Sequence, residues 1–238
     1  MSGKEKRIIA LDYSSQEEAL ALVGVLGEEA AYYKVGMELF YSSGGDIVRH
    51  LKAAGKKVFL DLKLHDIPNT AAKGLGALTR LGADMLNVHA SGGLEMMRRA
   101  GEVVAEEALR CGMQAPVVLA VTVLTSIGGD EWARLGQVEP VNKAVLRLAQ
   151  LTQEAGLQGV VASPQEAAAI RQACGKDFAI VTPGIRPAGV SVDDQQRVAT
   201  PASALAAGAS HLVIGRPVTK AEDPLAALRR LAAEMEGA

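Results

Sequence analysis

The sequence predicts an α/β fold, a (β/α)8 TIM barrel that forms a single domain over residues 1–238. Two observations predict it. Eight short runs rich in leucine or β-branched residues alternate with Ala-, Leu- and Glu-rich stretches of helical periodicity. Each strand and helix pair takes about 30 residues, which suits a closed parallel barrel of this length. A doubly wound open sheet is the alternative architecture.

The strands are predicted from apolar runs that end at a turn residue or a charge. The first run, Ile8-Ile9-Ala10-Leu11, ends at Asp12, and the last ends at Gly215. Barrel enzymes place their sites at the carboxyl ends of the strands, so residues at these ends are the first candidates for function. The predicted strands are Arg7–Asp12, Tyr32–Gly36, Lys57–Lys63, Asp84–His89, Val117–Thr122, Gln158–Val161, Phe178–Thr182 and His211–Gly215.

The helices are predicted from periodicity together with start and stop signals. Ser15 with Glu18 indicates a capping box, and Pro164 after Ser163 is typical of a first helical position. Glycines such as Gly82 and Gly156 end helices just before the next strand. A stretch of about fifteen residues after the seventh strand, 186–200, is expected to be an irregular loop, and loops of that size are often functional. The predicted helices are Ser15–Leu26, Asp46–Ala54, Thr70–Leu81, Leu94–Arg110, Val141–Ala155, Pro164–Ala173 and Pro224–Glu234.

Composition narrows the classes of partner. The 25 Lys and Arg against 27 Asp and Glu give a net charge of -2, and no block of like charge gathers to bind nucleic acid. The apolar run after the charged N-terminus is cut short by Asp12, so we expect no leader and no membrane span. Cys111 and Cys174 lack zinc-ligand spacing and a disulfide pattern. We therefore expect a cytoplasmic protein with a small-molecule ligand.

The third strand and its exit carry the densest charge, in the segment Asp61-Leu62-Lys63-Leu64-His65-Asp66. Strand alternation places Asp61 and Lys63 on one face and the leucines on the other. A buried ion pair contributes little to stability because desolvation offsets attraction, so function is the better interpretation of this pair. Asp66 lies beyond the strand, where it either belongs to the same site or caps the helix that follows.

Two further strands end in charged candidates. Lys34 lies in an apolar strand whose inner face would not accept an ammonium without carboxylate partners, which a catalytic network would supply. The alternative is a lysine that extends to solvent at the barrel rim. Asp12 ends the first strand and either helps its turn or belongs to the site. His89, at the end of the fourth strand, is assigned no role.

Two arginines follow the last two strands, in Thr182-Pro183-Gly184-Ile185-Arg186 and Val213-Ile214-Gly215-Arg216. These two loops of a barrel often bind phosphate, because glycine frees backbone N–H groups and a guanidinium matches the phosphate oxygens. The pattern predicts a phosphorylated substrate. Two solvated turn arginines are the alternative.

Taken with the strand-end residues, the chain resembles the orotidine 5'-phosphate decarboxylase family in its stand-alone bacterial form. A related group of Mg-dependent sugar-phosphate enzymes shares the barrel and the Asp-x-Lys-x-x-Asp element, but places a metal-binding Glu where this chain has Lys34. Since a lysine repels a divalent cation, the resemblance selects the enzyme without metal or cofactor. The matching segments are 10–12, 33–40, 59–68, 87–90, 122–126, 181–186 and 214–216.

The resemblance implies decarboxylation of orotidine 5'-monophosphate to uridine 5'-monophosphate in pyrimidine synthesis. It implies that Lys63 donates a proton to C6 of the pyrimidine, within a chain of alternating charges completed by Lys34, Asp61 and Asp66. It also implies a homodimer, in which Asp66 and Thr70 reach the site of the partner. The substrate-binding residues implied are Asp12 and Lys34 at the ribose, Thr125 near the pyrimidine, and Arg186, Gln195, Gly215 and Arg216 at the phosphate, with Gln196 as the alternative to Gln195.

Overall fold

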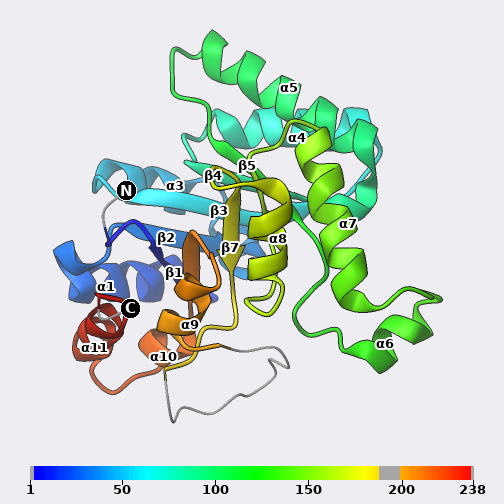
Figure 1. The fold of residues 1–238 in the computed structure, drawn as a ribbon. Coiled ribbons are helices and arrows are strands. Elements are labelled where there is room, and N and C mark those ends of the chain that lie inside the picture. Colours follow the sequence, from blue (N-terminus) through cyan, green and yellow to red (C-terminus); the bar gives the residue numbers. More distant parts are fainter. Residues whose placement is uncertain (1–2, 188–198, 237–238) are drawn as a thin grey trace.

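The computed structural model describes residues 3–187 and 199–236. Its eight strands pair in parallel in chain order, and β1 also pairs with β8, so the sheet closes into a barrel (Figure 1). The predicted fold class is thereby confirmed, and the open sheet is excluded by the pairing of the first and last strands. The strands are β1 (Arg7–Leu11), β2 (Tyr32–Gly36), β3 (Lys57–Leu64), β4 (Met85–His89), β5 (Val117–Val121), β6 (Gly159–Val161), β7 (Ala179–Thr182) and β8 (His211–Ile214).

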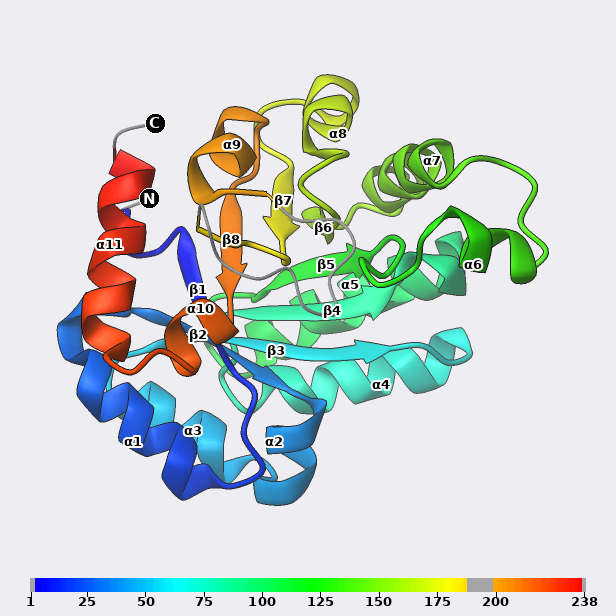
Figure 2. The ribbon, with the colours of Figure 1, turned by 90° about the horizontal axis from the view of Figure 1, so that it is seen from below.

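Helices surround the barrel, as Figure 2 shows. They cover the outer face of the sheet, where the strands present one set of alternating side chains. The helices are α1 (Gln16–Leu26), α2 (Met37–Ser43), α3 (Asp46–Ala53), α4 (Pro68–Thr79), α5 (Leu94–Arg110), α6 (Gly129–Arg134), α7 (Val141–Glu154), α8 (Ala167–Cys174), α9 (Pro201–Ala206), α10 (Arg216–Thr219) and α11 (Pro224–Glu236), with 3-10 turns η1 (Gly27–Glu29) and η2 (Ala90–Gly92).

Of the two helix start signals, the one at Ser15 is confirmed and the one at Pro164 is wrong. Ser15 is the N-cap of α1, and its hydroxyl accepts a hydrogen bond from the Glu18 N–H at 3.2 Å. The predicted start at Pro164 is wrong, because the Ser163 hydroxyl accepts from the Gln165 N–H and holds 164–166 in a turn, so α8 begins at Ala167. The short helices α2, α6, α9 and α10 were not predicted, since none is longer than seven residues and a periodic pattern needs more turns to show.

Apolar burial divides into two cores. The larger lies between the strands and the helices and includes Leu60 and Leu62 of β3. The smaller fills the barrel interior with one or two residues from most strands, including Phe59 of β3 and Leu119 of β5. In β2 and β3 its members Tyr32 and Phe59 come two residues before Lys34 and Asp61, so the inward polar side chains of these strands lie toward their carboxyl ends.

A bulge interrupts the pairing of β3 with β4. Leu60 lies opposite Leu86 and Leu64 opposite Val88, so four residues of β3 advance along two of β4. Lys63 lies within this bulge with φ 51, the only positive φ of a residue other than glycine in the described part of the chain. Bulges bend a strand and re-aim its side chains, and this one occurs at the charged pair that the sequence singled out.

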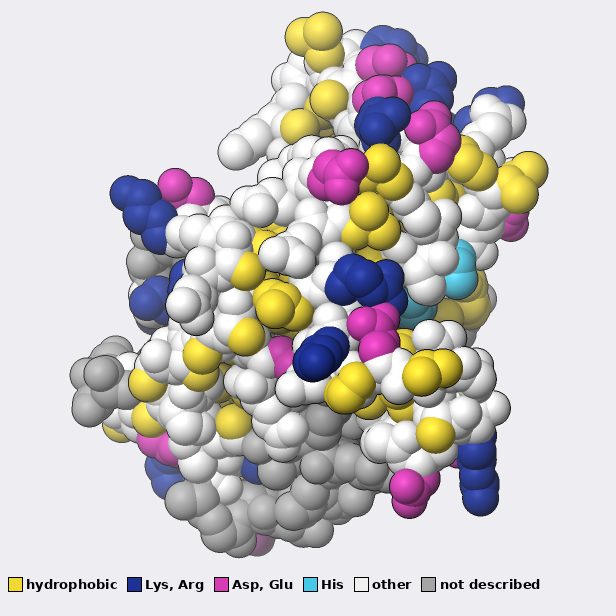
Figure 3. All heavy atoms as spheres, turned by 45° about the vertical axis from the view of Figure 1, so that its right-hand side comes forward, with side chains coloured by type: hydrophobic (Ala, Val, Ile, Leu, Met, Phe, Trp, Pro, Cys, Tyr) yellow, Lys and Arg dark blue, Asp and Glu magenta, His cyan; other side chains and the backbone are white. Residues whose placement is uncertain are grey.

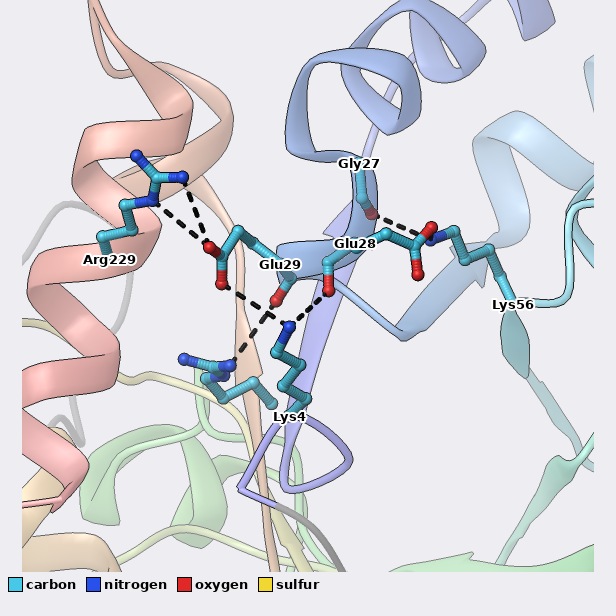
Figure 4. Close-up of polar contacts among 7 residues, drawn as sticks. Lys4, Gly27, Glu28, Glu29, Lys56 and Arg229 are labelled. Atoms are coloured by element: carbon cyan, nitrogen blue, oxygen red, sulfur yellow. Dashed lines mark hydrogen bonds and ion pairs between the residues drawn. The ribbon is translucent and has the colours of Figure 1, made fainter.

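Several polar contacts lie around η1, which precedes β2 (Figure 4). Glu29 accepts from Arg229 of α11 at 3.3 Å and lies 3.8 Å from Lys4 of the N-terminal segment. Lys4 also donates to the Glu28 carbonyl, and Lys56 donates to the Gly27 carbonyl, both at 2.8 Å. These contacts join the N-terminal segment, the last helix and the turn before β3 to η1.

Two features bear on partners. In the face shown in Figure 3, basic and acidic side chains lie next to one another near the centre, and no broad basic patch is seen on that face. Within the described residues, no helix combines the length and the apolar character that crossing a membrane requires.

Candidate active site

A cavity of about 330 Å³ opens among the residues that end or follow the strands. Its volume lies at the lower end of the range for small-molecule sites. Six of the strands, or the loops directly after them, contribute lining residues from segments that the sequence singled out. These are Asp12 after β1, Lys34 on β2, Asp61 and Lys63 on β3, Thr125 and Ser126 after β5, Arg186 after β7, and Gly215 and Arg216 after β8.

Four charges of alternating sign cross one wall of this cavity. The Lys34 Nζ lies 2.9 Å from Asp12 Oδ1 and 3.5 Å from Asp61 Oδ2. The Lys63 Nζ lies 2.8 Å from the other oxygen of Asp61, Oδ1. The side chains of Lys34 and Asp61 are each 11% exposed, against 25% for Lys63 and 61% for Asp12. Lys34 therefore does not extend into solvent, and Lys63 is the more accessible of the two ammonium groups.

The protonation of the two buried members follows from their partners. Burial alone would lower the pKa of Lys34, but the carboxylates of Asp61 and Asp12 outweigh it and raise that pKa above its usual value. Burial alone would raise the pKa of Asp61, yet Lys34 and Lys63 together bring it below the usual value. Both groups are thus charged at neutral pH, and the network keeps its alternating order.

Local sequence places these groups. In β3, Leu60 and Leu62 pack outward into the larger core while Asp61 and Lys63 line the cavity, as strand alternation predicted. Gly36 ends β2 beside them, and a Cβ added there would lie 3.1 Å from Lys34 Nζ. Gly36 therefore leaves the space that the Lys34 ammonium occupies between its two carboxylates.

Asn87 belongs to this wall, and the sequence analysis did not single it out. It is 1% exposed on β4, donates from Nδ2 to Asp61 Oδ1 at 2.7 Å, and accepts at Oδ1 from the Lys63 N–H at 2.7 Å. The signal that could have found it is alternation in the predicted strand 84–89. Asn87 lies on the same face as Met85 of the inner core, where an amide needs a polar partner.

Two arginines also line the cavity. Arg186 is buried, with 7% of its surface exposed, and donates from Nη1 to the Ile185 carbonyl at 3.0 Å. Its N–H donates to the Ala199 carbonyl, which ties the two ends of the loop 186–200 together. Arg216 and Gly215 line the cavity on the next strand end. The structure thus brings both predicted arginines to one site, whereas Gln195 and Gln196 lie outside the described residues.

Thr125 and Ser126 also line the cavity. Thr125 is 9% exposed, and the neighbouring Val123 and Leu124 add apolar surface. The lining of this cavity thus combines charged, hydroxyl and apolar groups, as is usual for a small-molecule site.

Asp66 and Thr70 do not line this cavity, and both are exposed. Asp66 Oδ1 accepts a hydrogen bond from the Ile67 N–H at 2.7 Å. The alternative that Asp66 caps the next helix is wrong, because Ile67 is the N-cap of α4 and α4 has no side-chain cap hydrogen bond. Ile67 is 68% exposed beside them, so the start of α4 presents an acidic, hydroxyl and apolar surface to the outside.

His89 and His65 stack near Lys63, with ring centroids 5.3 Å apart. Burial, together with His65 and Lys63, lowers the pKa of His89. At neutral pH His89 therefore adds no positive charge beside the ammonium. Among the described residues, no cluster of three or more His, Cys, Asp or Glu side chains has the arrangement of a metal site.

Comparisons with known proteins agree with this geometry. Residues 6–231 match the sequence model of the family described as "Orotidine 5'-phosphate decarboxylase / HUMPS family". The chain is 53% identical to orotidine 5'-phosphate decarboxylase of Moorella thermoacetica, over 99% of this chain and 94% of the relative. It is 52% identical to the enzyme of that name from Nitrosococcus oceani, over 98% of each.

Solved structures agree as well. The crystal structure of orotidine 5'-phosphate decarboxylase from Lactobacillus acidophilus superposes with a TM-score of 0.85 at 40% identity, covering 96% of this chain and 97% of that one. Fold and sequence likeness extend over nearly the whole length of the chain. The chain therefore belongs to the orotidine 5'-phosphate decarboxylase / HUMPS family.

Proposed function

We propose that this decarboxylase converts orotidine 5'-monophosphate to uridine 5'-monophosphate and CO2 without a metal or cofactor, with Lys63 as the cation that stabilises the reacting carbon and then protonates it. The observation that carries the proposal is the alternating row of Asp12, Lys34, Asp61 and Lys63 along one wall of the cavity. The names and coverage of the relatives support the substrate.

The chemistry makes a fixed cation necessary. When the bond from C6 to the carboxylate breaks, the electron pair stays on C6 in an orbital that the pyrimidine ring cannot delocalise. Electrostatic stabilisation is strongest when the charge is held in place before the reaction. The Lys63 ammonium, 2.8 Å from Asp61 and itself partly exposed to the cavity, is such a charge. Its proton passes to C6, and the resulting amine regains a proton from water.

The remaining residues bind and orient the nucleotide. Asp12 and Lys34 are assigned to the ribose hydroxyls, and Thr125 with Ser126 to the pyrimidine. Arg186, Gly215 and Arg216 are assigned to the 5'-phosphate, with Gln195 from the loop beyond the described residues. The phosphate does not react, but binding energy from a remote group can hold the reacting ring against the charged wall and so raise turnover.

A homodimer completes the proposed site. Asp66 and Thr70 are exposed beside Ile67, at the start of α4 and outside the cavity of their own chain. Across a dimer interface they would extend the row of charges with a second carboxylate near Lys63. We place the enzyme in the cytoplasm, which suits its two free thiols, one of them exposed.

The test of the function is direct. Purified protein treated with EDTA is mixed with orotidine 5'-monophosphate, and the loss of substrate absorbance is followed. We expect turnover that EDTA does not change and that Lys63→Ala abolishes. Turnover that requires an added divalent metal, or no turnover at all, would contradict the proposal. Full activity of Lys63→Ala would contradict the role of Lys63.

The shared site has a separate test. Inactive Lys63→Ala chains and inactive Asp66→Asn chains are mixed under conditions where subunits exchange, which is checked with tagged chains. One site of each hybrid then holds both native groups, so activity is expected to return. Exchanged hybrids that stay inactive would show that Asp66 does not act across the interface.

A further inference from the structure

We propose that Asn87 is a positioning residue for this reaction, holding both the backbone of Lys63 and the carboxylate of Asp61 in the geometry that presents the ammonium to the substrate. This inference rests on the proposed function of Lys63. The observation behind it is a single buried amide that bonds to both members of the charged pair at 2.7 Å.

The first contact fixes the backbone. Lys63 lies in the β3 bulge, where the regular ladder to β4 is interrupted between Leu60 and Leu64. Its φ of 51 falls in a left-handed region that residues with a side chain rarely adopt. Asn87 Oδ1 accepts from the Lys63 N–H and so supplies the bond that the ladder does not. Without it, no side chain of β4 holds the backbone at Lys63 in this unfavourable conformation, and the ammonium loses its fixed position.

The second contact fixes the carboxylate. Asn87 Nδ2 donates to Asp61 Oδ1, the same oxygen that lies 2.8 Å from the Lys63 ammonium. Asp61 Oδ2 lies 3.5 Å from Lys34. With both oxygens engaged, the carboxylate cannot rotate toward one lysine at the expense of the other. Asn87 therefore decides how Asp61 divides its charge between Lys34 and Lys63.

A purely structural role makes a different prediction. Asn87 is buried, so its loss destabilises the barrel in either case. If Asn87 only fills space, the molecules that remain folded should turn over at the normal rate. If it positions Lys63, kcat falls while KM changes little, because Asn87 does not line the cavity.

Two variants separate its two contacts. Asn87→Leu removes both and is expected to lower kcat about 10- to 100-fold, the effect of losing a hydrogen bond to a charged group, with KM within about threefold. Asn87→Asp keeps the acceptor for the Lys63 N–H and loses the donor when ionised. Its kcat relative to the parent should rise as the pH falls from 8 to 5, because the protonated new carboxyl can donate to Asp61.

The groups around this new carboxyl are Asp61 and Lys63 from β3 and His89 from β4, with Lys34 beyond Asp61. The parent and Asn87→Asp are measured over the same pH range, so titration of these native groups cancels in the ratio. A ratio that does not change with pH would overturn the assignment of the Nδ2 contact.

Leu119→Ala is the matched control. Leu119 pairs with Asn87 in register on β5, is fully buried in the inner core and does not line the cavity. It should lower stability but leave kcat within about twofold. An equal loss of kcat in Leu119→Ala and Asn87→Leu would overturn the proposal. If Asn87→Leu does not fold, the pH ratio of Asn87→Asp decides.

A readout independent of activity separates this inference from the proposed function. Amide hydrogen exchange of the Lys63 N–H, followed by NMR, should be at least 10-fold faster in Asn87→Leu than in the parent and unchanged in Leu119→Ala. Unchanged exchange in Asn87→Leu would overturn the backbone contact. Parent protein that does not decarboxylate the nucleotide would refute the proposed function, and the exchange experiment would still decide whether Asn87 holds Lys63.

Discussion

Replacing Asp61 with Asn tests the charged wall most sharply, because it removes the one carboxylate that two ammonium groups share. Lys63 Nζ lies 2.8 Å and Lys34 Nζ 3.5 Å from its oxygens. At an effective dielectric of 20 these separations correspond to ~6 and ~5 kcal/mol of attraction, which desolvation largely offsets. Measured losses on breaking buried pairs are about 3–5 kcal/mol, so we expect Asp61→Asn to lower the free energy of unfolding by that amount.

A second substitution should recover much of this loss. Lys34→Met removes the more buried ammonium, and its other partner, Asp12, is exposed enough to be solvated alone. The double variant Asp61→Asn/Lys34→Met is therefore expected to be more stable than the sum of the single effects predicts, by about 2–3 kcal/mol. Urea unfolding at pH 7, followed by circular dichroism and by the fluorescence of the single Trp132, measures each free energy.

The result that would refute this reasoning is additivity. If the effects of Asp61→Asn and Lys34→Met add within about 0.5 kcal/mol, the two charges do not interact and the wall is not an electrostatic unit. The activity of Asp61→Asn tests the same charged wall independently of the free energy of unfolding. Asp61→Asn should lose nearly all turnover even where it is fully folded, because Lys63 then lacks its nearest partner.

Three further predictions concern other parts of the molecule. Burial lowers the pKa of His211 from 6.5 to about 4, so His211 is neutral in the folded state at neutral pH. The free energy of unfolding should therefore be highest above pH 6.5 and fall by up to ~3 kcal/mol as the pH drops toward 4. The fall should be less steep in His211→Gln. Gly159→Ala should lower the free energy of unfolding in urea by about 1–3 kcal/mol, because the new Cβ would lie 2.2 Å from the Ala179 carbonyl oxygen. Gly24→Ala, in α1 with no atom near the new Cβ, should raise it by about 0.5–1 kcal/mol. Equal effects of the two substitutions would contradict this prediction. Arg216→Ala should lower kcat/KM about 10- to 100-fold, mainly through KM, and unchanged kinetic constants would remove Arg216 from the phosphate site.

The strands could be predicted closely because each is a short apolar run with a clear stop. β2 matches its prediction fully, and the first run extends only one residue beyond β1. The helices were harder where length was short or a local bond intervened. Ser163 holds its turn through a side-chain bond to the Gln165 N–H, and no pattern of apolar residues reports such a competition.

The site was predictable in so far as strand ends converge. Asp12, Lys34 and Lys63 lie far apart in the chain and meet because parallel strands end at one rim. Asn87 was missed because its significance depends on the bulge in β3, and a bulge is not visible in the periodicity of either strand. Asp66 and Thr70 do not line the cavity of their own chain, so their proposed role across a dimer interface rests on the resemblance alone.

The left-handed backbone at Lys63 has a consequence for how this chain can change over generations. A side chain in that conformation costs about 1–2 kcal/mol, which glycine would not incur. The position of the proposed proton donor is thus one at which the backbone conformation itself favours glycine over lysine. A duplicated gene that is no longer selected for catalysis would be expected to accept glycine at this position early. Its protein would be more stable and, without the proposed proton donor, inactive.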